Sequence, residues 1–221
     1  MRWLIPLLLA GPAAAQEFVV APGPLSDEAF YRAVACAAQP DGVCQKPFIR
    51  WNAEKREALG VSLASIAPGL PPYKRQLIEA GLDDAIAQIN GLDAGIRLLR
   101  AAGEGDIDVH IVSTPPGNIM TGTGIPALDG NMLPLGRVAL RAREGEIREG
   151  VIAISAFVRR REIASILLEE ITQALGLMTD IRGPAYRRSL FSEDGNSVTR
   201  IVGQDAAALR RHYAADGEGG S

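Results

Sequence analysis

The stretch LLEEITQALGLMTD, Leu167–Asp180, carries the clearest pattern in this sequence. Apolar residues recur there and just upstream at helical spacing, which predicts an amphipathic helix over residues 160–176. Glu169 and Gln173 are one turn apart, so they are expected on the same polar face, with Glu170 displaced toward its flank. A polar face of this kind is ordinarily a solvated surface.

The same stretch also has the residue spacing of a zinc-protease helix. In the metzincin motif H-E-x-x-H-x-x-G-x-x-H, the histidines hold zinc and the glutamate activates water. Those positions are occupied here, in order, by Glu169, Glu170, Gln173, Gly176 and Thr179. The stretch resembles a metzincin helix in which every histidine is replaced. Gly176 is predicted to end the helix in a left-handed conformation and to turn the chain back toward it.

Four polar residues are the candidates for a site: Glu169, Glu170, Gln173 and Asp180. Three interpretations are open. The three carboxylates can hold calcium or magnesium, or Glu170 can serve as a general base with Glu169 and Asp180 as helpers. In the third, the side chains face inward and only form hydrogen bonds. Zinc hydrolysis of the familiar kind is not expected, because an amide oxygen is a poor zinc ligand.

Composition narrows the chemistry further. The only histidines, His110 and His212, fall in a predicted strand and in the last predicted helix, outside any ligand pair, so a packing or surface role is expected for both. We therefore predict no metal and no cofactor, and the pattern favours a protein without enzymatic activity. The formal net charge of −3, with arginines mixed among glutamates, argues against nucleic-acid binding.

Periodicity and turn residues divide the rest of the chain into helices and strands. A first helix starts after Ser26 as N-cap, a second runs from about Pro72 to the dipeptide NG, and a short last helix starts near Gln204. Between strands, Ser113–Gly136 has 24 residues and no periodic pattern, which is typical of a functional or mobile loop. The extended segments are PFIRW, LGVSLASI, IRLLRA, IDVHIVST, RVALRARE and GVIAISAF, the last apolar enough to be central.

This order of elements resembles the zincin fold over about residues 48–213. It implies an α+β protein in which a twisted mixed sheet packs on two long helices, with a small C-terminal helical part. The segments EEITQALGLMTD and SLFSEDG, and the D…LR…Y pattern of the last helix, resemble the bacterial exported family "domain of unknown function 2927". Thr179 departs from that family, which usually has asparagine there. The resemblance implies no assigned activity.

The N-terminus predicts export. Residues 1–15 combine Arg2, an apolar run and the small residues of a cleavage site after Ala15, as in a secretory signal peptide. The only two cysteines, Cys36 and Cys44, are expected to form a disulfide in an oxidising compartment. The expected location is periplasmic or secreted. The predicted divisions are 1–15 signal peptide, 16–46 N-terminal helix and disulfide loop, 47–213 zincin-like domain and 214–221 disordered tail.

The leading functional hypothesis is an exported, non-catalytic domain that binds an envelope peptide or protein in a cleft between an edge strand and the long helix. One alternative is a divergent hydrolase that uses Glu170 as base, with Glu169 and Asp180 as helpers or oxygen ligands. The other is a structural module of the cell envelope. No second apolar run is long enough to span a membrane, and the oligomeric state is left open.

Overall fold

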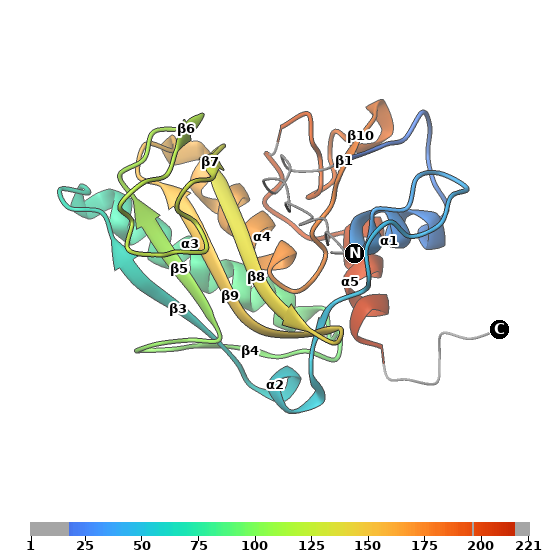
Figure 1. The fold of residues 1–221 in the computed structure, drawn as a ribbon, viewed down its shortest axis with the longest axis horizontal. Helices are drawn as coiled ribbons and strands as arrows, with labels where there is room; N and C mark the ends of the chain where they lie inside the picture. The colour runs from blue at the N-terminus through green and yellow to red at the C-terminus, as the bar shows by residue number, and fades with distance from the viewer. Residues whose placement is uncertain (1–17, 196, 215–221) are drawn as a thin grey trace, which may run out of the picture.

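A six-stranded mixed sheet forms the centre of the molecule (Figure 1). The computed structural model describes residues 18–195 and 197–214, so the predicted signal peptide and residues 215–221 of the predicted tail lie outside the described residues. Along the sheet the strands follow the order β2-β9-β5-β3-β4, all parallel, and β8 pairs antiparallel with β9. Their bounds are β2 Arg50–Trp51, β3 Leu59–Ile66, β4 Leu98–Arg100, β5 Ile107–Val112, β8 Gly136–Arg143 and β9 Glu146–Ser155.

The position of β9 follows from its composition. It pairs with β5 on one side and with β8 on the other, and its last six residues are all buried. A strand covered on both faces and paired on both edges must be apolar throughout, as GVIAIS nearly is. The prediction of a central strand here is confirmed.

Two helices lie behind the sheet and pack against each other (Figure 1): α3 Pro72–Gly91 and α4 Ile163–Gln173. The predicted start of α3 at Pro72 is confirmed, and proline is well placed in the first turn because its missing N–H has no partner to lose there. The helix predicted over residues 160–176 is shorter than expected. Residues 160–162 form a 3₁₀ turn, and the α-helix ends at Gln173.

The remaining described elements form a second group beside the sheet. Helix α1 packs against α5, and β1 pairs in parallel with β10. The rings of Phe30, Tyr186 and Phe191 pack together in the core of this group. The sequence patterns miss β1, β10 and α2. The bounds of this group and of α2 are β1 Phe18–Val20, α1 Asp27–Cys36, α2 Ala53–Glu57, β10 Asp180–Arg182 and α5 Gly203–Tyr213.

The start and end of α1 agree with the sequence. Ser26 is the N-cap, and its hydroxyl oxygen accepts a hydrogen bond from the Ala29 N–H at 3.2 Å. Cys36 and Cys44 are joined in a disulfide, with their Cα atoms 5.1 Å apart, so the predicted pairing is confirmed. None of the helices in the described part of the chain is both long and apolar enough to cross a membrane.

The long segment between β5 and β8 has more structure than its sequence indicates. It contains a short antiparallel hairpin, β6 Asn118–Ile119 and β7 Met132–Leu133. It also has a small core of its own, built by Val112, Met120, Leu128, Leu133, Val151 and Ala153. A loop that buries its own apolar side chains against the sheet is held in place as an Ω-loop is.

Candidate functional site

The structure brings two of the four candidate residues into direct contact. Gln173 closes α4, and Asp180 opens β10. The Gln173 Nε2 donates a hydrogen bond to Oδ1 of Asp180 at 2.8 Å, and both side chains are buried. The expectation of a solvated polar face is therefore wrong for Gln173. This bond ties the end of the helix to the strand that follows it.

Glu170 occupies the most unusual environment of the four. Its side chain is 4% exposed, and its Oε2 has no hydrogen-bond partner in the described chain. The helical pattern displaced this residue toward the flank of the polar face, but that flank is covered by β8. A Cβ added at Gly136, the first residue of β8, would lie 2.2 Å from the Glu170 Oε1. Only glycine leaves room for the carboxyl group there.

Electrostatics favour the neutral acid at Glu170. Burial raises the pKa of Glu170 well above 4.5, the charges of Glu169 and Asp180 raise it further, and Arg137 opposes them. Glu169 itself is half-buried. A protonated carboxyl group in an apolar setting is chemically a hydrogen-bond donor or a proton source, and groups with such shifts are common at functional sites.

Gly176 forms the predicted turn. Its φ is +102°, in the region that favours glycine, and its N–H donates to the Gln173 carbonyl at 2.8 Å. A Cβ at this position would lie 2.2 Å from the Ile49 carbonyl oxygen and 2.7 Å from Nε2 of His212. The turn therefore needs glycine for its conformation and also for the close approach of two other segments.

His212 and Tyr213, at the end of α5, pack against the Gly176 turn. The ring of His212 is fully buried between the Tyr31 hydroxyl, 3.3 Å from Nδ1, and the Ile49 carbonyl oxygen, 3.0 Å from Nε2. Burial, together with the charge of Arg50, lowers the pKa of His212 to about 3, so the ring is neutral. His212 therefore has the packing role that the sequence predicted, and its hydrogen bonds involve none of the four candidate residues.

The carbonyl groups that follow α4 are also satisfied by side chains far away in sequence. The Trp51 Nε1 donates to the Ala174 carbonyl at 3.0 Å, and the Tyr213 hydroxyl donates to the Leu175 carbonyl at 2.7 Å. A helix end leaves carbonyl oxygens without intrahelical partners, so these two bonds fix where α4 stops. Sequence reasoning missed both donors, because neither lies near α4 in the chain.

The segment SLFSEDG is held to α5 by one buried carboxylate. Asp205 accepts hydrogen bonds from the Ser189 hydroxyl at 2.6 Å and from the Leu190 N–H at 2.7 Å. Burial raises the pKa of Asp205, and these two bonds oppose the rise. Asp205 and Tyr213 of the D…LR…Y pattern thus have a structural explanation: Asp205 connects α5 to the segment after β10, and Tyr213 connects it to the connection after α4.

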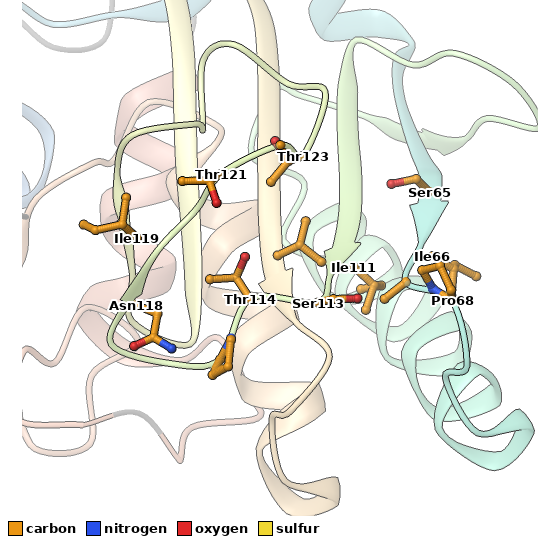
Figure 2. Close-up of a pocket in the computed structure, with 14 residues that line it drawn as sticks. Ser65, Ile66, Pro68, Ile111, Ser113, Thr114, Asn118, Ile119, Thr121 and Thr123 are labelled. Atoms are coloured by element: carbon orange, nitrogen blue, oxygen red, sulfur yellow. The ribbon is translucent and has the colours of Figure 1, made fainter.

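A second candidate site lies at the carboxyl ends of β3 and β5 (Figure 2). It is a pocket of about 520 Å³ between these strands and the β6–β7 segment. Pockets at the carboxyl ends of parallel strands are frequent ligand sites. No candidate residue from the sequence lines it, although the length of the loop pointed to this region. Its polar lining side chains carry hydroxyl or amide groups and no charge: Ser65, Ser113, Thr114, Asn118, Thr121 and Thr123.

The candidate residues do not form a recognisable metal centre. Within residues 18–195 and 197–214, no group of three or more histidine, cysteine, aspartate or glutamate side chains is arranged to hold a metal ion. His110 lies apart in β5, where its Nδ1 is 2.8 Å from the Ser65 hydroxyl. Of the four candidates, Glu170, Gln173 and Asp180 are buried, and Glu169 is half-buried.

Comparison with known proteins gives one assignment. A search of curated proteins found no match. A family model described as "Protein of unknown function (DUF2927)" matches residues 29–218, which include every helix and strand of the described chain except β1 and the first two residues of α1. The match contains the α4–β10 connection, the SLFSEDG segment and α5. The chain belongs to the DUF2927 family.

Proposed function

We propose that this protein is an exported, non-catalytic domain of zincin-like fold that binds an extended peptide or envelope protein along β8. The observation that carries the proposal is the pairing of β8. In the described chain this eight-residue strand pairs with β9 alone. The backbone groups on its other edge can therefore pair with an added strand, which is a common mode of peptide recognition.

The order of elements supports the zincin-like part of the proposal. A strand and a long helix, β3 and α3, are followed by two strands, a long loop, the β8–β9 hairpin and then α4. This is the order for which the sequence resembles zincins. Strand β8 and helix α4 are neighbours, and Glu170 lies between them. The edge strand and the helix that would border a zincin-like cleft are thus side by side.

The environment of the candidate residues supports a binding role over a catalytic one. A general base must reach the proton it removes, but the Glu170 carboxyl group is packed on Gly136 beneath β8. The Gln173 amide, at a zinc-ligand position of the motif, is engaged with Asp180. These groups hold α4 against β8 and β10.

The hydrolase alternative is retained on one observation, the unpartnered Oε2 of Glu170 with its raised pKa. Such a group would act as a base if a substrate displaced β8 and exposed it. Glu169 and Asp180 would then serve as its helpers. The two proposals make different predictions for the fate of a bound peptide.

A displayed peptide library, selected on the purified protein, provides the test. We expect a selected peptide to bind and to shift the backbone amide NMR signals of residues 136–143. N-methylation at alternate positions removes the N–H groups that pair with an edge strand, so it should abolish binding in one register and have little effect in the other. Shifts elsewhere, or equal effects in both registers, contradict the proposal. Cleavage of the peptide, followed by mass spectrometry and lost in Glu170→Gln, favours the hydrolase.

A further inference from the structure

The N-terminal ends of α3 and α4 lie together at one corner of the molecule. The Lys74 ammonium in the first turn of α3 donates to the Ala156 carbonyl at 2.5 Å, just before the segment that leads into α4. Leu77 of α3 lines a pocket of about 630 Å³ together with Arg159, Arg160 and Arg161. The two helix starts therefore present their side chains to the same surface.

Most of the charge at this corner is opposite to what helix starts favour. The N-terminus of a helix is electropositive and favours carboxylates. Helix α3 has no acidic residue in its first turn, and Glu162, the N-cap of α4, is a carboxylate at the start of that helix. Against it stand Lys74 and Arg75, which begin α3, and three consecutive arginines, residues 159–161, which precede α4.

Only part of this positive charge is neutralised within the protein. Arg75 pairs with Glu79 at 2.9 Å, and Arg159 is 3.7 Å from Glu162. Arg160 and Arg161 are exposed and have no ion pair within the described residues. The protein as a whole carries a formal net charge of −3, so the positive charge at this corner has the opposite sign to that of the whole chain.

The turn between β8 and β9 provides a contrast. The strands on either side of it also carry three exposed arginines, but each has a carboxylate partner. Arg141 pairs with Glu149, Arg143 with Glu144, and Arg148 with Glu146. The exposed arginines of the β8–β9 hairpin are therefore balanced by carboxylates, whereas Arg160 and Arg161 are not.

Two aromatic side chains flank the arginines. Phe157, between β9 and the arginines, is 58% exposed, and Tyr73, beside Lys74, is 56% exposed. Burying an aromatic ring away from water lowers the free energy, and these two rings do not have that stabilisation while they are exposed to solvent. A mixture of exposed arginine and aromatic residues suits the interface of a membrane, where rings enter the headgroup region and cations meet anionic lipids.

We propose that this corner, comprising Tyr73, Lys74, Phe157 and Arg159–Arg161, docks the protein on a membrane surface that contains anionic lipids. The cations supply attraction to the lipid phosphates, and the two rings insert at the level of the headgroups. The proposal does not depend on peptide binding along β8. Attraction should weaken with added salt, because exposed charges are screened.

Flotation of the purified protein with vesicles tests the proposal. The probes are phosphatidylcholine vesicles with and without phosphatidylglycerol. We expect binding to the anionic vesicles only. A variant that combines Arg159→Gln, Arg160→Gln and Arg161→Gln should bind about 100-fold more weakly, since each basic residue near an anionic surface contributes roughly fivefold. The matched control, Arg141→Gln, Arg143→Gln and Arg148→Gln together, should bind as the wild type does.

The aromatic variants separate a membrane from a soluble polyanion. Phe157→Ser and Tyr73→Ser should weaken vesicle binding while leaving its dependence on salt unchanged. Thermal unfolding measured by circular dichroism shows that each variant is folded. The proposal is overturned by no binding to anionic vesicles, or by equal losses in the two triple variants. It is also overturned if soluble polyphosphate competes fully and the serine variants bind vesicles as the wild type does, because the ligand is then a polyanion in solution.

Discussion

Gln173, the last residue of α4, donates its side-chain amide to the carboxylate of Asp180, the first residue of β10, across 2.8 Å in the buried interior. The two residues stand at the two ends of the connection between α4 and β10, which contains the Gly176 turn. The bond therefore joins the start of this connection to its end. In the zinc-protease motif whose spacing this stretch resembles, the residue in the place of Gln173 is a histidine that binds metal. In this protein, Gln173 instead joins the end of α4 to the start of β10.

The first prediction concerns the strength of this bond. Gln173→Ala, Asp180→Ala and the double variant form a mutant cycle, which isolates the pair from the other contacts of each residue. A buried hydrogen bond to a charged group should give a coupling of about 1.5–3 kcal/mol in the free energy of unfolding. Urea denaturation measures it. The exposed pair Arg75 and Glu79 is the control and should give about 0.5 kcal/mol or less. Equal couplings for the two pairs would contradict the role assigned to Gln173.

The second prediction concerns Glu170 and pH. Its folded pKa lies above the ordinary value of 4.5, so its contribution to stability is fully present below about pH 4.5 and is lost as the pH rises through the folded pKa. Glu170→Gln keeps the shape and cannot ionise. The stability of this variant relative to wild type should therefore increase with pH from about 4.5, by up to roughly 1.4 kcal/mol per pH unit, and then level off.

Urea denaturation across a pH series measures this difference. Glu54→Gln, at an exposed position on α2, is the matched control and should follow the wild type at every pH. If the Glu170→Gln and wild-type curves run parallel, the carboxyl group is not held in its neutral form. The pH at which the difference levels off gives the folded pKa of Glu170.

Much of the fold can be predicted from the sequence because its longer elements are periodic. The strands around β5 and β9 and the helix from Pro72 have patterns that depend only on neighbouring residues. The missed strands β1 and β10 have three residues each, and they exist because they pair with one another across the length of the chain. No local pattern encodes such a pairing.

The site is predicted less well for a related reason. A helical wheel assumes one buried face and one solvated face, but α4 is enclosed by α3, β8 and β9. Glu170, expected at the edge of the polar face, is consequently the residue that β8 covers. The residues Glu169, Glu170, Gln173 and Asp180 were found from the stretch Leu167–Asp180, while Gly136, which borders Glu170, and His212, which packs on the Gly176 turn, have no signal in the sequence.

The third prediction separates two roles of Gly176. Gly69 also has a positive φ, +76°, but an added Cβ there meets nothing within 4 Å. Gly69→Ala should therefore cost only backbone strain, about 1–2 kcal/mol. Gly176→Ala adds a clash with the Ile49 carbonyl and His212, and should cost about 3–5 kcal/mol in total. Urea denaturation of both variants gives the comparison. Similar costs would mean that the neighbouring segments move aside freely.

The last prediction tests whether the helix keeps the geometry of a zinc site. Glu169→His with Gln173→His places two imidazoles one turn apart, as in the zinc-protease motif. The Gln173 amide nitrogen lies 2.8 Å from the Asp180 carboxylate, so an imidazole at position 173 would have that carboxylate beside it as a further ligand or an orienting partner. We expect zinc binding by calorimetry that the wild type lacks.

Two imidazoles one turn apart bind zinc weakly on any helix. The zinc affinity of the variant at residues 169 and 173 must therefore be compared with that of a second histidine pair placed on another helix of this protein. Glu79→His with Asp83→His has the same spacing on α3, where Asp83 is exposed. If the fold is zincin-like, the pair at residues 169 and 173 should bind zinc at least about tenfold more tightly, or about 1.4 kcal/mol. Equal affinities would remove the support for the zincin resemblance. Tight zinc binding by the wild type would remove the support for a non-catalytic fold instead, because amide and carboxylate oxygens would then be acting as the metal ligands.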